Sequence, residues 1–195
     1  MEFLEFPKLA RLHRECLITE KIDGTNACVV VDEAGQVAAQ SRNRLLIHES
    51  DPYGFALWVE RHKDTLRDVL GSGHHFGEWW GSGIQRKYGL VDGHKRFSLF
   101  NVVRWAETSF SALGGVVATV PLLYRGPFTT DAAHAATAGL VEGGSRAAPG
   151  FMKPEGIVVF HIAGNVGFKA TIERDEERKG RRPDSSVTVS PERGE

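Results

Sequence analysis

One lysine of this chain stands among small polar residues between two apolar stretches. Lys21 lies in the run 20–26, which reads Glu-Lys-Ile-Asp-Gly-Thr-Asn. A lysine that enters an apolar strand is costly to bury unless its amine has a role. The pKa of a lysine amine falls readily on burial, and the neutral amine is a nucleophile. We therefore interpret Lys21 as a nucleophile that attacks a nucleotide phosphate.

A second lysine and an acid occupy similar apolar settings near the end of the chain. Glu155 and Gly156 precede the apolar run 157–160, and Lys169 lies within the strand-like stretch 165–172. Gly156 can allow a ligand or another backbone to approach closely. The acid and glycine before an apolar strand echo the pattern around Lys21, and Lys169 is the second lysine embedded in a strand.

Glu78 is an acid in an unusual place, between the start of an apolar strand and two adjacent tryptophans in the segment 77–81. Buried acids are normally paired or hydrogen-bonded, so two interpretations are open. Either Arg86 or Lys87 satisfies the carboxylate, or the carboxylate accepts hydrogen bonds from the hydroxyl groups of a ligand.

Three other positions carry weaker signals. Arg42, with a second arginine two residues later, follows a predicted strand, which suits phosphate contacts or a surface ion-pair cluster. Phe100 lies on an alternating strand, where a phenylalanine more often packs in a core than stacks on a base. His74 and His75 are adjacent, so on a strand they face opposite ways and are poor candidates for one shared metal site.

The apolar pattern predicts the elements that position these residues. We expect strands at 17–20, 27–31, 36–40, 96–103, 151–160 and 165–172, with a hairpin turn at 32–35. A strand interrupted at Pro121 is expected within 116–124. The clearest helix is 55–70, and shorter helices are expected from about Lys8 and, capped by 129–131, from Ala132 to Ala138.

The composition is that of one ordinary globular domain. The 195 residues carry 24 Lys+Arg against 25 Asp+Glu, a formal net charge of -1, so any nucleic-acid binding must use a local patch. The two cysteines, Cys16 and Cys28, form no CxxC pair, which favours a reducing compartment. The sequence shows neither a membrane-spanning apolar run nor a signal-peptide pattern, so we expect a cytoplasmic protein that does not bind membranes.

Five elements together resemble a known superfamily. They are Lys-x-Asp-Gly at 21–24, Gly-Glu-Trp-Trp-Gly at 77–81, the aromatic strand at 97–100, Glu-Gly at 155–156 and Lys169. In this order they resemble the covalent nucleotidyltransferase superfamily of ATP-dependent RNA and DNA ligases and capping enzymes. The likeness is greatest to the RNA ligase family typified by the second RNA ligase of phage T4, over residues 5–180.

The resemblance implies an α+β fold, a nucleotidyltransferase (ATP-grasp-like) domain of antiparallel sheets flanked by helices. We expect this adenylation domain at 1–172. Charges dominate from 173 to 195, and we expect a disordered tail there.

The resemblance also implies a role for each matched residue. Lys21 would be the adenylated lysine, and Lys169 the second catalytic residue, at the α-phosphate. Residues expected to bind the nucleotide are Glu20, Asp23, Gly24, Arg42, Glu78, Phe100, Glu155 and Lys169. Within this set, Glu78 would lie near the ribose and Phe100 would stack on adenine. Glu155, together with Asp23, would hold Mg²⁺ or Mn²⁺.

The implied reaction is ATP-dependent RNA ligation through a lysine–AMP intermediate. The neutral amine of Lys21 would attack the α-phosphate of ATP, with its pKa depressed by burial and by a nearby cation. AMP would pass to a 5′-phosphate end, and a 3′-hydroxyl would displace it to seal an RNA end or nick. DNA and RNA–DNA hybrids are open alternatives as substrates.

The chain departs from the family pattern in two places. The family often has Lys-x-Lys where this chain has Lys169-Ala170-Thr171. Such ligases also carry a further C-terminal domain, for which we see no room after Lys169, so a partner protein or a separate domain would bind the ends.

Three other interpretations stay open. The chain could be a stand-alone nucleotidyltransferase that caps RNA with GMP or modifies another acceptor. It could be a non-catalytic module that binds nucleotides or RNA. The plainest alternative is an α+β domain whose lysines are ordinary surface residues.

Overall fold

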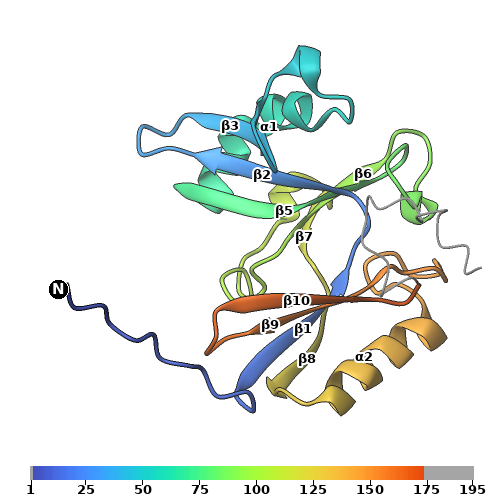
Figure 1. The fold of residues 1–195 in the computed structure, drawn as a ribbon. Coiled ribbons are helices and arrows are strands. Elements are labelled where there is room, and N and C mark those ends of the chain that lie inside the picture. The colour runs from blue at the N-terminus through green and yellow to red at the C-terminus, as the bar shows by residue number, and fades with distance from the viewer. Residues whose placement is uncertain (1, 174–195) are drawn as a thin grey trace, which may run out of the picture.

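The computed structural model describes residues 2–173, which fold into two β-sheets with one helix against each (Figure 1). In chain order the elements are β1 (Glu15–Lys21), β2 (Thr25–Val31), β3 (Val37–Ser41), β4 (Leu45–Leu46), α1 (Phe55–Leu70), β5 (Gly73–Gly81), β6 (Lys95–Leu99), β7 (Val117–Thr119), β8 (Leu122–Pro127), α2 (Thr130–Gly143), β9 (Gly156–His161) and β10 (Val166–Thr171), with 3-10 turns at His48–Ser50, Lys87–Gly89 and Ser111–Leu113. The predicted disorder of the tail falls, apart from Glu173, outside the described residues.

The two sheets differ in size but share an antiparallel design. The smaller sheet has the strand order β10-β9-β1-β8, and the larger has the order β4-β3-β2-β5-β6-β7. Every pair is antiparallel except β6 with β7, which run parallel. The expected α+β class, with antiparallel sheets flanked by helices, is therefore confirmed.

Each helix covers the outer face of one sheet. Helix α1 packs its apolar side, including Phe55, Val59 and Leu66, on one face of the six-stranded sheet. Helix α2 packs on the four-stranded sheet, where Leu140 is buried against β1 and β9. In Figure 1, α1 and α2 lie at opposite ends of the molecule, so the uncovered faces of the two sheets are turned toward each other.

The chain crosses between the two sheets at two places, and both lie in segments that the sequence analysis singled out. β1 belongs to the small sheet and β2 to the large one, so residues 22–24 form the first crossing. The second lies at Val120 and Pro121, where the interrupted strand was expected: β7 pairs in the large sheet and β8 in the small one. A third core cluster, which includes Ile22, Trp80 and Val120, fills the junction.

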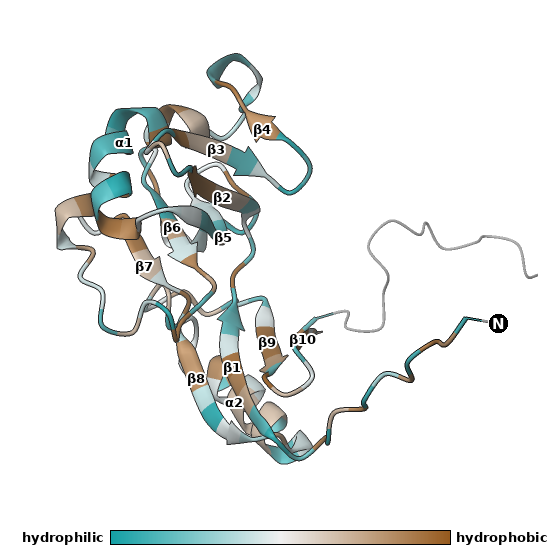
Figure 2. Ribbon diagram, turned by 90° about the vertical axis from the view of Figure 1, so that its left-hand side faces the viewer, coloured by the Kyte–Doolittle hydropathy of each residue, from teal (hydrophilic) through white to brown (hydrophobic). Residues whose placement is uncertain are grey.

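Several local predictions differ from the structure. The helix from about Lys8 is wrong, because residues 2–14 form no helix and lead away from the sheets as an extended segment (Figure 2). An isolated helix this short is marginal in water without a surface to pack on. The strand expected over 96–103 ends at Leu99, where a turn begins, and the strand expected over 151–160 begins only at Gly156. The helix expected over 132–138 extends to Gly143.

Other local predictions are confirmed. Helix α1 has the expected bounds, and Thr129 caps α2 by accepting a hydrogen bond from the backbone N–H of Ala132 at 3.0 Å. His74 is exposed whereas His75 is buried, as expected for neighbours on a strand. Within residues 2–173, no helix is both long and apolar enough to cross a membrane.

Candidate active site

Lys21 is the last residue of β1, at the point where the chain leaves the four-stranded sheet. In the register of this sheet it lies opposite Gly156, the first residue of β9. A Cβ atom at Gly156 would overlap the carbonyl oxygen of Ala170 on β10, so this close approach of strands requires glycine. The Lys21 side chain is 20% exposed and donates a hydrogen bond from Nζ to Oε2 of Glu155 at 2.5 Å. Glu155, at 4% exposure, thus forms a partly buried ion pair with the candidate nucleophile.

Gly24 joins the Lys21 segment to the six-stranded sheet. Its backbone N–H donates to Oε1 of Glu78 at 3.0 Å. A Cβ atom at this position would lie 2.5 Å from the carbonyl oxygen of Trp79 and 2.8 Å from Cβ of Trp80. The glycine of the motif therefore allows the first crossing to pack directly on β5.

Glu78 sits on β5, on the face opposite to helix α1. Burial raises the pKa of its carboxyl from 4.5 to about 7, and the negative charges of Glu155 and Asp23 act in the same direction. The hydrogen bond from Gly24 and the positive charge of Lys21 oppose this rise. The structure therefore places Glu78 in the same electrostatic neighbourhood as Lys21, Asp23 and Glu155.

Asp23 is held by two residues that follow β5. Its backbone N–H donates to the hydroxyl of Tyr88 at 2.9 Å, and its Oδ2 accepts from Nε of Arg86 at 3.2 Å. Sequence reasoning assigned Arg86 or Lys87 to Glu78 as the plain alternative. That assignment is wrong for Arg86, which pairs with Asp23, while Glu78 is bonded to the backbone of Gly24.

Lys169 shares a face of the four-stranded sheet with Lys21. The β1–β9–β10 register aligns Lys21 with Gly156 and Thr171, and aligns Thr19 with Val158 and Lys169. Paired residues, and residues two apart on one strand, point to the same face. Lys169 is exposed on this face, which is turned away from α2.

A cavity of about 190 Å³ lies on the uncovered face of the six-stranded sheet. Its lining brings together two residues predicted to bind the nucleotide, Arg42 and Phe100, with Asn26, Gly77 and Phe76. Phe100 is 42% exposed and is not a core residue. Asn26 lies beside Glu78 in the register of β2 and β5, so the cavity and the carboxylate are adjacent.

Glu20 points away from this face, because it alternates with Lys21 along β1. Its carboxylate accepts hydrogen bonds from Oγ of Ser145 at 2.5 Å and from the backbone N–H groups of Arg146 and Ala147 at 2.7 and 3.0 Å. Glu20 is only 1% exposed, and these hydrogen bonds hold the segment after α2 against β1. The structure thus separates Glu20 from the other predicted nucleotide-binding residues.

The predicted metal ligands are carboxylates that already have partners. Among residues 2–173, no group of three or more His, Cys, Asp or Glu side chains is placed to hold a metal. The negative charges of Asp23 and Glu155 both raise the pKa of the Glu78 carboxyl, so these acids influence one another without forming a metal site of three ligands among the described residues. Their carboxylate oxygens are nevertheless the type of ligand that Mg²⁺ and Mn²⁺ prefer, and these ions usually keep several waters.

Some residues of this site were not predicted from the sequence. Tyr88 is buried and adopts a left-handed backbone conformation, with φ 49° and ψ 34°. Ser145 gives the buried Glu20 its hydroxyl partner. Neither residue lies in a recognisable motif, and only the proximity created by folding identifies them.

A family model described as RNA ligase matches residues 14–171, most of the chain. No curated protein matches the sequence.

Solved structures of Naegleria gruberi RNA ligase have a similar fold. A variant with AMP and Mn is 21% identical, with a TM-score of 0.59 over 82% of this chain and 50% of that chain. A second variant, with ATP and Mn, is also 21% identical, with a TM-score of 0.60 and the same coverage. This chain thus spans about half the length of those proteins, and the likeness shows the RNA ligase nucleotidyltransferase fold.

Proposed function

Because this chain belongs to the RNA ligase family, we propose that it is an ATP-dependent nucleotidyltransferase that forms lysine–AMP at Lys21 and serves RNA ligation. The observation that carries this proposal is the ion pair between Lys21 and Glu155, located where the two sheets meet and beside Glu78. A lysine with these neighbours, on the same face as a second exposed lysine, is suited to phosphate chemistry.

Different residues around Lys21 would contact the adenine, the ribose and the α-phosphate of ATP. The cavity that contains Arg42 and Phe100 would receive the adenine, with Phe100 offering an exposed ring for stacking. Glu78, which is adjacent through Asn26, would accept hydrogen bonds from the ribose hydroxyls. Lys169 would bind the α-phosphate, because it shares a sheet face with Lys21.

Catalysis begins when the Lys21 ammonium group gives up a proton. Oε2 of Glu155 lies 2.5 Å from Nζ and is placed to accept it. Nζ then attacks the α-phosphorus in line, so that a P–N bond forms and the bond from the α-phosphorus to the bridging oxygen breaks. Pyrophosphate leaves with the electron pair of that bond. Asp23 and Glu155 would hold Mg²⁺ or Mn²⁺, which when bound neutralises charge on the phosphoryl oxygens.

The later steps of the proposed activity use RNA ends. AMP would move from Lys21 to a 5′-phosphate, and a 3′-hydroxyl would then displace AMP to seal the strand. Since the chain spans about half the length of the Naegleria ligase, a further domain or a partner would supply additional contacts to the ends.

Label transfer from α-labelled ATP to the protein tests the proposal. We expect covalent label on the wild-type protein and none on Lys21→Ala, because the attacking amine is gone. Lys63→Ala is a matched control, since Lys63 lies on α1 and pairs only with Glu60 among the described residues. Label on Lys21→Ala equal to that on the control would contradict the assignment of the nucleophile.

A second candidate function keeps lysine–AMP but changes the acceptor, and the half-length coverage favours considering it. Comparing ATP with GTP for labelling, and then adding nicked RNA or nicked DNA, distinguishes the two. Transfer of AMP to the 5′-phosphate of nicked RNA supports ligation. Labelling by GTP, or no transfer to any end, supports another acceptor. Reversible nucleotide binding without any label would indicate a non-catalytic module.

A further inference from the structure

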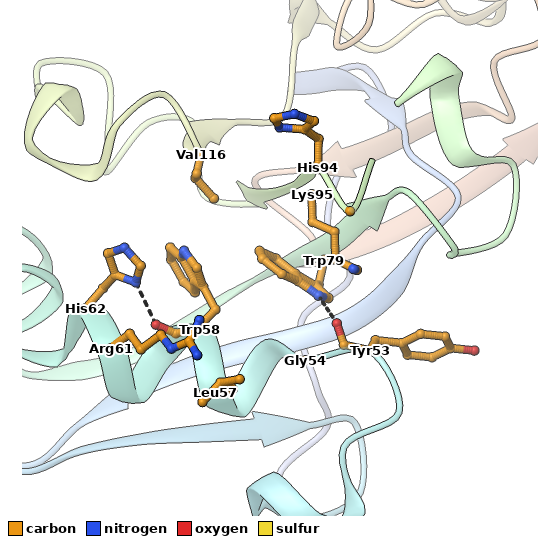
Figure 3. Close-up of a pocket in the computed structure, with 11 residues that line it drawn as sticks. Tyr53, Gly54, Leu57, Trp58, Arg61, His62, Trp79, His94, Lys95 and Val116 are labelled. Carbon is orange, nitrogen blue, oxygen red and sulfur yellow. Dashed lines mark hydrogen bonds between the residues drawn. The ribbon is translucent and has the colours of Figure 1, made fainter. Parts of the chain in front are cut away.

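A second cavity, of about 310 Å³, is lined by residues of α1, β5 and β6 and of the segments next to them (Figure 3). It lies on the other side of the six-stranded sheet from the candidate active site, as the strand register shows. Lys95 is opposite Gly81 and Phe97 is opposite Trp79 in the register of β5 and β6. Trp79, Phe97 and Lys95 therefore share the face that α1 covers, whereas Glu78 points to the opposite face. A molecule bound in this cavity would be separated from Lys21 by the sheet.

The lining of this cavity is positively charged. It includes Arg61 and His62 from α1, Lys95 at the start of β6 and His94 just before it, and it contains no acidic residue. Within residues 2–173, the side chains of Arg61 and Lys95 form no hydrogen bond or ion pair with another residue. The net charge of the whole protein is only -1, so this cavity is a local concentration of positive charge.

The other lysine and arginine of α1, unlike Arg61, are paired with acidic side chains. Lys63 pairs with Glu60 at 2.7 Å, and Arg67 pairs with Asp64 at 2.9 Å. Both lie outside the cavity lining. Among the lysines and arginines of α1, Arg61 alone lacks an acidic partner within residues 2–173, and it borders the cavity. Together with the unpaired Lys95, it gives the cavity a charge that suits a negatively charged ligand.

The inner wall of the cavity is aromatic. The rings of Trp58 and Trp79 have centroids 5.3 Å apart, and His62 stacks on Trp58 at 5.2 Å. His62 donates from Nδ1 to the carbonyl oxygen of Trp58 at 2.8 Å, a contact drawn in Figure 3, so its Nε2 is available to a ligand. The indole N–H of Trp58 is buried and has no acceptor among the described residues. Such unpaired buried donors are rare, and a polar ligand atom would satisfy this one.

We propose that this cavity is a second RNA-binding site, which holds one nucleotide of a single-stranded RNA segment. The base would lie against Trp58 and His62, and Arg61 and Lys95 would contact phosphates on either side of it. The volume is at the lower end of the range for small-ligand sites, which suits a single nucleotide. Two unpaired cations from different elements fit the successive phosphates of a strand better than the single phosphate group of a free nucleotide. Because this site does not involve Lys21, the proposal is independent of lysine–AMP formation.

Binding of a labelled oligoribonucleotide, measured by fluorescence anisotropy, tests this proposal. The probe is a single strand of about ten nucleotides with a 5′-hydroxyl, and ATP is omitted so that no chemistry occurs. The test variant is Arg61→Ala with Lys95→Ala. The control is Lys63→Ala with Arg67→Ala, which removes the same amount of charge, here from two positions of α1 outside the cavity.

We expect the test variant to lose about tenfold or more in affinity, and the control to stay near wild type. The slope of log K against log salt should become shallower by about 1.4 in the test variant, since each lost phosphate contact removes about 0.7 on single strands. Trp58→Phe keeps the ring but removes the N–H, and should weaken binding less than the double variant. Lysine–AMP formation should be unchanged in the test variant, which would also show that the protein is folded.

Two results would overturn the proposal. Equal losses in the test and control variants would mean that only general charge matters. The second result comes from photocrosslinking with a thiouridine-substituted probe. If the proposal is right, the crosslinks map to peptides containing 53–62 or 93–95. Crosslinks confined to the peptides of Asn26, Phe76 and Phe100 would instead place the whole strand on the other face.

Discussion

Lys21 and Lys169 lie on the same face of the four-stranded sheet, on two strands separated only by β9. Two strand spacings correspond to about 10 Å, which an extended lysine side chain and a bound phosphate can bridge together. The sequence places these residues far apart, and the antiparallel register alone brings them to one surface.

Replacing Lys169 should slow adenylation without abolishing binding of ATP. In Lys169→Ala, we expect the single-turnover rate of label transfer at saturating ATP to fall by about a hundredfold or more. The variant lacks the lysine ammonium group that would stabilise negative charge on the α-phosphate. Lys63→Ala is again the control for loss of a surface lysine. A rate for Lys169→Ala within twofold of that control would remove Lys169 from the site.

Glu78 should make stability depend on pH. Burial raises the pKa of this carboxyl to about 7 from an ordinary value of 4.5, so the folded protein binds a proton more tightly than the unfolded chain. Stability contributed by this group is present below pH 4.5 and is lost as the pH rises toward 7, by at most about 3 kcal/mol. Glu78→Gln cannot titrate, so its free energy of unfolding should fall less than that of wild type between pH 5 and pH 8. Urea unfolding at both pH values measures the difference, and identical changes in the two proteins would exclude a raised pKa.

Gly24 should tolerate no side chain. In Gly24→Ala, the new methyl group would meet the carbonyl oxygen of Trp79 at 2.5 Å, so the crossing between the sheets must shift. We expect a loss of about 1–3 kcal/mol in the free energy of unfolding, with loss of label transfer. Gly139→Ala is the matched control, because nothing lies within 4 Å of the added atom and the position is inside α2. That control should be neutral or more stable by about 0.5–1 kcal/mol. Equal stability of the two variants would show that the packing at Gly24 is not tight.

Glu20 offers a test between its sequence-based and its structural role. Glu20→Ala would leave the hydroxyl of Ser145 and the N–H groups of Arg146 and Ala147 without their acceptor. We expect a loss of about 3 kcal/mol or more in the free energy of unfolding, and a smaller loss of about 1 kcal/mol for Ser145→Ala. If Glu20→Ala were as stable as wild type but bound ATP more weakly, Glu20 would contact the nucleotide. Its hydrogen bonds to the 145–147 segment would then contribute little to stability.

The sequence determined the local elements and the residues of the motifs. Alternating apolar residues predicted most strands, and the apolar side of 55–70 predicted α1 with the observed bounds. These patterns succeed because each strand or helix buries one face, which fixes its period in the sequence. The helix expected near Lys8 fails for the same reason, since 2–14 has no surface on which to bury its apolar residues.

Only the tertiary structure decided how the motif residues are paired. Glu20 and Glu155 are both buried acids, yet Glu20 binds the segment after α2 while Glu155 binds Lys21. Arg86 pairs with Asp23 and not with Glu78, although Arg86 is far closer to Glu78 in the sequence. These choices depend on contacts between residues that are 63–134 positions apart, as for Arg86 with Asp23 and Lys21 with Glu155. Sequence patterns describe how each strand is buried, but the pairing of polar groups follows from which strands become neighbours, and that is fixed only when the two sheets fold together.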